Sequence, residues 1–133
     1  LPVNCVVPTE VQLNATLPSN NLVNAKWDPF GGGVVTIESI VDKVDVMKSL
    51  QKPKKVDFIG SDGSNYTMLC KPGDDLRKDG RMMEFNHALN ALLSKAHRKS
   101  APRVRTFAVV PLGEEWGVVE WVHNTRPLRF VLE

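Results

Sequence analysis

Hydrophobic residues alternate with polar ones in the middle of the chain, as they do in half-buried β-strands. The stretch from Val34 to Met47 is rich in β-branched residues and predicts a strand that ends near Met47. Residues 55–71 predict two further strands, the second of which ends at Lys71. A hairpin at residues 61–63 (Ser-Asp-Gly) should join them, because Asp and Gly tolerate the positive φ angles of tight turns.

Apolar residues recur every three or four positions in the next stretch, which predicts a long amphipathic helix. Pro72 and Gly73 end the preceding strand, and Asp74 places negative charge where a helix N-terminus favours it. The helix should run to about His97, before a basic segment and a proline. Its apolar face is formed by Leu76, Met83, Leu89, Leu92, Leu93 and Ala96.

Two short apolar segments after the helix, residues 104–112 and 116–122, predict two more strands, and Asn124 or Thr125 can cap a short terminal helix. The predicted fold class is therefore α+β, a five-stranded antiparallel sheet with one long helix after the third strand. The chain should divide into an irregular N-terminal segment, the sheet-and-helix unit and a C-terminal exit segment, at residues 1–33, 34–123 and 124–133.

Composition limits the classes of protein to consider. The chain has 133 residues, of which 42% are hydrophobic and 24% charged, as expected for one globular domain or part of one. It contains neither a membrane-spanning apolar run nor a signal-peptide pattern, so we expect a soluble intracellular protein with no membrane partner. Cys5 and Cys70 lie far apart without further ligands at suitable spacing, which argues against a zinc site or a disulfide framework.

The predicted order of strands and helix is the layout of a kinase small lobe, whose third strand carries a lysine that contacts nucleotide phosphates. Lys71 occupies that place, but its spacing alone favours a surface lysine at the end of a strand. Neither the G-x-G-x-x-G loop nor the V-A-I-K sequence of ordinary protein kinases occurs. An ordinary protein kinase is therefore disfavoured.

A long part of the chain nevertheless resembles a kinase family. Residues 49–86 read SLQKPKKVDFIGSDGSNYTMLCKPGDDLRKDGRMMEFN, and RTFAVVPL, GVVEWV and NTRPLR follow. This string resembles the phosphatidylinositol-3-kinase-related protein kinases. Within it, SLQKPKK, CKPGDDLRKD and RMMEFN are similar specifically to the ATR-type DNA-damage checkpoint kinases. The resemblance is specific over residues 47–129 and weaker over residues 1–46.

The resemblance places the phosphate loop at residues 47–53 rather than at the glycines of the Gly60–Gly63 hairpin. Charge supports this, because Asp62 would repel a triphosphate, whereas Ser49 offers a hydroxyl donor and Lys48 a positive charge. Lys54 and Lys55, by contrast, are expected to be exposed and solvated.

In the family, a lysine followed three and eight positions later by acids contacts the phosphates. The resemblance thereby implies that Lys71 binds the phosphates and that Asp74 and Asp79 position it. A carboxylate one turn inside a helix can hold such an ammonium group in place. We expect Asp75 and Arg77 to serve helix capping and surface pairing instead.

The resemblance also implies that GVVEWV is the hinge, where main-chain groups of Glu120 and Val122 pair with the adenine edge. Trp121 would supply an apolar wall, with a core or lobe-interface tryptophan as the alternative. Phe107 stands where many relatives have Tyr, whose hydroxyl can reach the carboxylate corresponding to Asp79. The expected adenine hinge and pocket comprise Met47, Phe107, Val119, Glu120, Trp121 and Val122.

The chain is thus interpreted as the ATP-binding small lobe of a nuclear Ser/Thr kinase that transfers the ATP γ-phosphate in DNA-damage checkpoint and repair signalling. Family membership implies protein substrates with Ser/Thr followed by Gln and an ATR-interacting partner subunit bound elsewhere in the parent. The catalytic base and the Mg²⁺ ligands are expected in an absent large lobe, which would leave this fragment inactive. The alternatives are a phosphoinositide lipid kinase small lobe and a non-catalytic, β-rich basic binding module that uses Lys95–Arg105.

Overall fold

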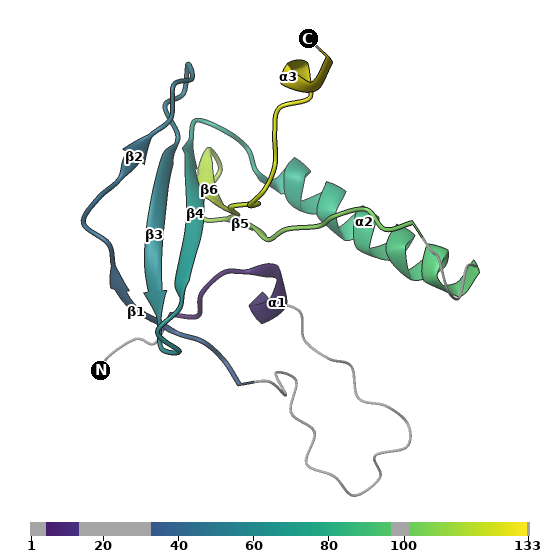
Figure 1. Cartoon of the computed structure of the whole chain (residues 1–133), viewed down its shortest axis with the longest axis horizontal. Helices are drawn as coiled ribbons and strands as arrows, with labels where there is room; N and C mark the ends of the chain where they lie inside the picture. Colours follow the sequence, from purple (N-terminus) through teal and green to yellow (C-terminus); the bar gives the residue numbers. More distant parts are fainter. Residues whose placement is uncertain (1–4, 14–32, 97–101, 133) are drawn as a thin grey trace, which may run out of the picture.

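A twisted antiparallel sheet with one long helix beside it forms the molecule (Figure 1). The computed structural model describes residues 5–13, 33–96 and 102–132. In the six-stranded sheet the order is β1-β3-β4-β6-β5, with β2 paired to β3, and the predicted α+β class is confirmed. The elements are α1 (Glu10–Leu13), β1 (Ile37–Ile40), β2 (Asp45–Val46), β3 (Lys54–Gly60), β4 (Asn65–Pro72), α2 (Arg77–Ala96), β5 (Val109–Pro111), β6 (Trp116–Glu120) and α3 (Arg129–Leu132).

The strand predicted to end near Met47 is in fact two strands, so the prediction of five strands was wrong. Both β1 and β2 pair with β3, through Ile40 opposite Phe58 and Asp45 opposite Lys55. From Ile40 to Asp45 the chain advances five residues, whereas β3 advances only three between their partners. Two residues between β1 and β2 are therefore left out of the ladder. Apolar alternation continues across this bulge and gives no sign of it.

The predicted hairpin between β3 and β4 is confirmed. Its turn is closed by hydrogen bonds from the Gly60 amide to the Ser64 carbonyl (2.9 Å) and from the Gly63 amide to the Gly60 carbonyl (2.8 Å). Gly63 takes a φ of 75°, which favours glycine. Because the pairing runs from Ile59 to Lys54 along β3, this turn lies at the opposite end of the strands from Lys71.

Helix α2 begins at Arg77, three residues later than expected, and Asp75 caps it by accepting a hydrogen bond from the Arg77 amide (3.1 Å). Leu76, just before the helix, is fully buried. The predicted apolar face is otherwise not buried: none of the α2 residues is classed as buried, and Leu92 is 64% exposed. The reason is visible in Figure 1, where α2 extends away from the sheet edge instead of lying across a face.

The last strands are shorter than predicted. Residues 104–108 are not part of β5, and both main-chain polar groups of Val104 bond the side chain of Asn90 on α2 instead, at 2.8 and 2.9 Å. The terminal helix α3 is confirmed. Its first hydrogen bond runs from the Phe130 amide to the Pro127 carbonyl, so neither Asn124 nor Thr125 caps the helix. The Thr125 hydroxyl instead donates to the Val122 carbonyl (3.1 Å).

A segment from the predicted irregular region, residues 5–13, adds to the sheet edge. The Val7 amide donates to the Val35 carbonyl (2.9 Å), and Val7 is fully buried, as are Met68 and Leu76. The four-residue helix α1 follows, and the rest of the predicted linker, residues 14–32, lies outside the described residues. None of the helices in the described ranges is long and apolar enough to span a membrane.

Candidate nucleotide-binding site

The turn between β2 and β3 faces the end of β4 across a pocket of about 220 Å³. Three hydrogen bonds close this turn: Met47 amide to Pro53 carbonyl (2.9 Å), Ser49 amide to Met47 carbonyl (3.0 Å) and Lys52 amide to Ser49 carbonyl (3.1 Å). Lys52 has a φ of 45°, which reverses the chain. The pocket is lined by Ser49, Leu50, Gln51, Pro53, Lys71, Pro72 and Asp74.

Lys71 is held in this pocket by carboxylates from the start of α2. Its ammonium nitrogen lies 3.3 Å from Asp74 Oδ2 and 3.7 Å from Asp79 Oδ2. The Lys71 side chain is 30% exposed, so it is partly shielded yet open to a ligand. A cation fixed in this way can neutralise a phosphate oxygen that enters the pocket.

The structure therefore brings Ser49, Lys71, Asp74 and Asp79 together, whereas Lys48 is exposed and does not line the pocket. Asp75 has the separate role expected of it, accepting hydrogen bonds from the Arg77 guanidinium at 2.8 and 3.0 Å. These hydrogen bonds lower the pKa of Asp75.

Burial raises the pKa of the Cys70 thiol, which precedes Lys71 on β4. The thiol is therefore protonated at neutral pH and is a poor nucleophile. Its pairing partner on β3 is Lys54, which is exposed as predicted.

Lys55, expected to be solvated, is half-buried instead. Its ammonium nitrogen lies 5.2 Å from the centre of the Trp121 ring, within the range of a cation–π contact. Lys55 and Leu69 are partners across β3 and β4, and Leu69 is in turn the partner of Val119 on β6. Directly paired residues share one face of a sheet, so this contact continues a surface that includes Leu69 and Val119.

The predicted hinge follows the end of β6. The Trp121 amide donates to the Thr67 carbonyl (3.0 Å) and the Glu120 amide to the Ala108 carbonyl (2.9 Å). Within the described ranges, neither the Glu120 main-chain carbonyl nor the Val122 amide has a hydrogen-bond partner. These are the two groups that the adenine edge would need.

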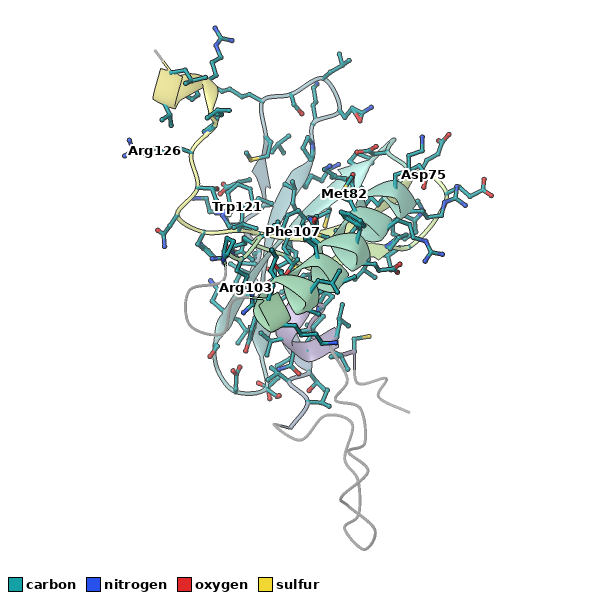
Figure 2. All side chains as sticks on the ribbon, turned by 90° about the vertical axis from the view of Figure 1, so that its right-hand side faces the viewer. Asp75, Met82, Arg103, Phe107, Trp121 and Arg126 are labelled. Atoms are coloured by element: carbon teal, nitrogen blue, oxygen red, sulfur yellow. The ribbon has the colours of Figure 1, made fainter. Side chains whose placement is uncertain are left out.

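Phe107 does not line the pocket of Ser49 and Lys71. It lines a groove of about 500 Å³ between α1, α2 and β5, together with Gly80, Met83 and His87. The structure thus brings Phe107 beside the helix that carries Asp79, but it does not bring Phe107 into the pocket of Lys71 and Ser49. Figure 2 shows Phe107, Trp121 and the exposed Met82 of α2 in one view.

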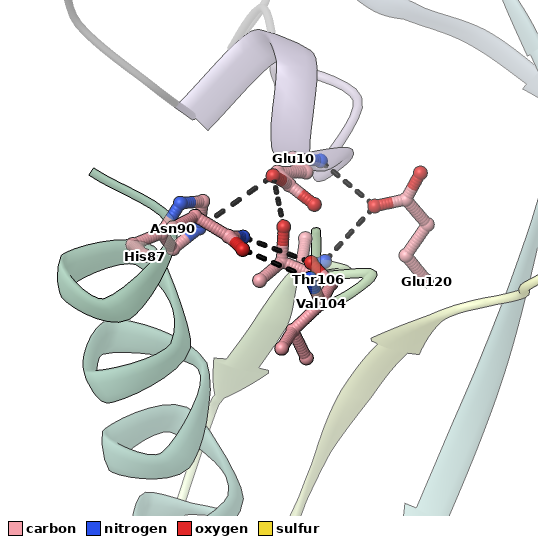
Figure 3. A network of polar contacts seen from close by, with 7 residues as sticks. Glu10, His87, Asn90, Val104, Thr106 and Glu120 are labelled. Atoms are coloured by element: carbon pink, nitrogen blue, oxygen red, sulfur yellow. Dashed lines mark hydrogen bonds and ion pairs between the residues drawn. The ribbon is translucent and has the colours of Figure 1, made fainter. Parts of the chain in front are cut away.

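One polar network was missed by sequence reasoning (Figure 3). Glu10 Oε1 accepts a hydrogen bond from the Thr106 hydroxyl (2.6 Å) and lies 3.6 Å from His87 Nε2. The Glu10 amide donates to Glu120 Oε2 (2.8 Å). Glu10 and Thr106 are 96 positions apart, so no local sequence pattern can predict their contact.

A metal site is not formed by this part of the protein. Across residues 5–13, 33–96 and 102–132, no three His, Cys, Asp or Glu side chains gather closely enough to hold a metal ion. Asp74 and Asp79 are both engaged with Lys71.

Protein kinases are among the known proteins that this chain is similar to. The serine/threonine-protein kinase ATR of Oryza sativa subsp. japonica is 50% identical over 100% of this chain and 5% of its own length. The protein kinase rad3 of Schizosaccharomyces pombe is 46% identical over 98% of this chain and 6% of its own length. The chain thus spans only a small part of these relatives.

A solved structure described as the FAT and kinase domain of CtTel1 superimposes with a TM-score of 0.68 and 30% sequence identity, over 87% of this chain and 8% of that one. Residues 65–133, about half of the chain, match the family described as phosphatidylinositol 3- and 4-kinase. The chain belongs to the phosphatidylinositol 3- and 4-kinase family, and within that family it is similar to the ATR-type protein kinases.

Proposed function

We propose that the chain is the ATP-binding small lobe of an ATR-type serine/threonine protein kinase that acts in DNA-damage checkpoint signalling in the nucleus. The observation that carries the proposal is the position of Lys71, between two carboxylates and in one pocket with Ser49. A surface lysine at the end of a strand needs neither the pocket nor a second acid. The similarity to ATR-type kinases over the whole chain supports the same assignment.

In this proposal the Lys71 ammonium and the Ser49 hydroxyl bind phosphate oxygens of ATP. Asp74 and Asp79 keep the ammonium in place, so that little reorganisation is needed as charge develops on the transferring group. Lys48, which is exposed and outside the pocket, would contribute through its charge alone.

Adenine would bind at the end of β6. The Glu120 carbonyl would accept a hydrogen bond from the base and the Val122 amide would donate one, because both groups are without a partner among the described residues. Trp121, Met47 and Phe107 would supply apolar contact, and Val119 would control the depth of the pocket behind the base.

Phosphoryl transfer also needs a base and carboxylates for Mg²⁺, which in kinases lie in a catalytic loop and a D-F-G-type motif. We propose that both are supplied by the large lobe of the parent, whose carboxylates would hold the Mg²⁺ that offsets the negative charge of the phosphates. The 133-residue chain alone should therefore be inactive and should bind ATP with a Kd in the millimolar range or weaker, about −4 kcal/mol. Submicromolar binding in a calorimetric titration would contradict a half-site.

The experiment that tests the function uses the purified parent protein, with any partner subunit that copurifies. Phosphate transfer from ATP is measured to a Ser-Gln peptide, to the matched Ser-Ala peptide and to phosphoinositide vesicles. Preferential phosphorylation of the Ser-Gln peptide is expected. Transfer to the vesicles alone would establish the lipid kinase alternative, and salt-dependent nucleic-acid binding without transfer would favour the basic binding module.

A further inference from the structure

The side chain of Glu120 accepts a hydrogen bond that its own main-chain carbonyl would accept in a regular sheet. Val109 and Val119 are partners in the ladder of β5 and β6, so Ala108 and Glu120 come next in register. In a regular antiparallel ladder, opposing pairs alternate, and in every second pair the two residues exchange both hydrogen bonds. Here the Glu120 amide donates to the Ala108 carbonyl (2.9 Å), but the Ala108 amide donates to Glu120 Oε2 (2.9 Å).

A second hydrogen-bond donor holds the Glu120 carboxylate in this position. Glu120 Oε2 also accepts the hydrogen bond from the Glu10 amide at the start of α1 (2.8 Å). Glu10 is itself fixed by the buried Thr106 hydroxyl, which donates to Glu10 Oε1 (2.6 Å). Figure 3 shows the two hydrogen bonds that the Glu120 carboxylate accepts, one from the start of α1 and one from the segment before β5.

A main-chain carbonyl at the end of a strand is left without a partner as a result. An Ala108 amide without the carboxylate would turn to the Glu120 carbonyl, because buried main-chain donors find acceptors. The carboxylate removes this competition and leaves the carbonyl available to a ligand. Adenine can bind such a carbonyl, because its 6-amino group is a donor.

We infer that the Glu120 carboxylate is a positioning group that keeps the Glu120 main-chain carbonyl free to bind the 6-amino group of adenine. This inference rests on the proposed function, since it concerns the same nucleotide site. It assigns base specificity to a side chain that does not touch the base. Glu10 and Thr106 support it from the N-terminal segment and from the strand before the hinge.

The test compares ATP with purine riboside triphosphate, which lacks the 6-amino group, as substrates of the parent kinase. Glu120→Ala should raise the KM for ATP about fivefold to tenfold, the range of one hydrogen bond, with kcat little changed. The KM for purine riboside triphosphate should stay within about twofold, because that nucleotide has nothing to donate to the carbonyl. Glu120→Gln should behave like the wild type, because its amide oxygen accepts the same two hydrogen bonds.

Two further variants make the result interpretable. Glu114→Ala removes an exposed carboxylate from the turn between β5 and β6 and should change neither KM. Glu120→Asp retains the charge but is one methylene too short to reach the Ala108 amide, so it should copy Glu120→Ala even if that variant folds poorly. Thermal unfolding of each variant verifies that the fold is intact.

The outcomes separate this inference from the proposed function. Equal increases in both KM values for Glu120→Ala and Glu120→Asp would show a merely structural role and overturn the inference. Unchanged KM values would overturn it as well. Equal use of the two nucleotides by the wild type would refute the inference while leaving ATP binding intact, whereas a wild-type parent that neither binds nor uses ATP would refute the proposed function itself.

Discussion

Lys71→Met in the parent kinase isolates the charge on which the proposed phosphate contact depends. The substitution removes the ammonium group and keeps most of the apolar stem, so packing at the end of β4 should change little. In the wild type this ammonium lies 3.3 Å from Asp74 Oδ2 and 3.7 Å from Asp79 Oδ2. Removing it leaves two carboxylates that are 46% and 51% exposed and therefore remain hydrated.

The expected effects on stability and on activity differ widely in size. Ion pairs with partners this exposed contribute at most about 1 kcal/mol to folding, because water and salt screen them. If the ammonium stabilises charge on the transferring phosphates, its loss should lower turnover about a hundredfold to a thousandfold, or about 3–4 kcal/mol. A variant that folds normally and is nearly inactive is therefore the expected result.

The assay is kcat and KM for ATP with a Ser-Gln peptide, accompanied by a thermal melt. Lys78→Met is the matched control, because Lys78 is an exposed lysine on α2 outside the phosphate pocket. Asp79→Asn should also lower activity, and the double variant should lose less than the sum, because both residues serve one contact. Strict additivity, or a Lys71→Met enzyme as active as the Lys78→Met control, would refute the reasoning.

Further predictions concern the chain itself. Gly80→Ala should raise the free energy of unfolding by about 0.5–1 kcal/mol in a urea titration, because a methyl group there meets nothing within 4 Å inside a helix. Gly117→Ala should lower it by about 1–3 kcal/mol in the same titration, because its Cβ would lie 2.5 Å from the main-chain oxygen of Val110. Phe107→Tyr should leave Tm nearly unchanged in a thermal melt; a loss of about 1–3 kcal/mol would reveal a buried hydroxyl without a partner. A thiol reagent at pH 7 should modify Cys70 slowly, because burial raises its pKa, and rapid labelling would contradict its half-buried position.

Local chemistry was sufficient to predict the hairpin and the capping role of Asp75, although α2 begins three residues later than expected. Gly63 needs only its own positive φ to mark the turn, and Asp75 needs only the next few amides to cap α2. The break between β1 and β2 could not be predicted in this way. It depends on how Asp45 pairs with Lys55, and an alternating pattern carries no information on the partner strand.

In the candidate site, too, residues close in sequence were predictable and those joined by distant contacts were not. Lys71, Asp74 and Asp79 are close in sequence, so a family motif of fixed spacing could name all three. The roles of Glu10 and His87 depend on contacts across most of the chain, and His87 had no recognisable partner in the sequence. The apolar face of α2 shows the opposite limit, because Leu92 follows the helical period well but has no covering layer in the described residues.

Two of the residues that line the phosphate pocket, Pro53 and Pro72, have φ angles locked by their rings. Fixing the backbone of one free residue costs about 1–2 kcal/mol in conformational entropy, and at a proline part of that restriction already exists in the unbound protein. A glycine-rich phosphate loop must be ordered by its ligand, because glycine explores a wide range of angles. The backbone of this pocket can therefore adapt less to its ligand, but it loses less conformational entropy when the ligand binds.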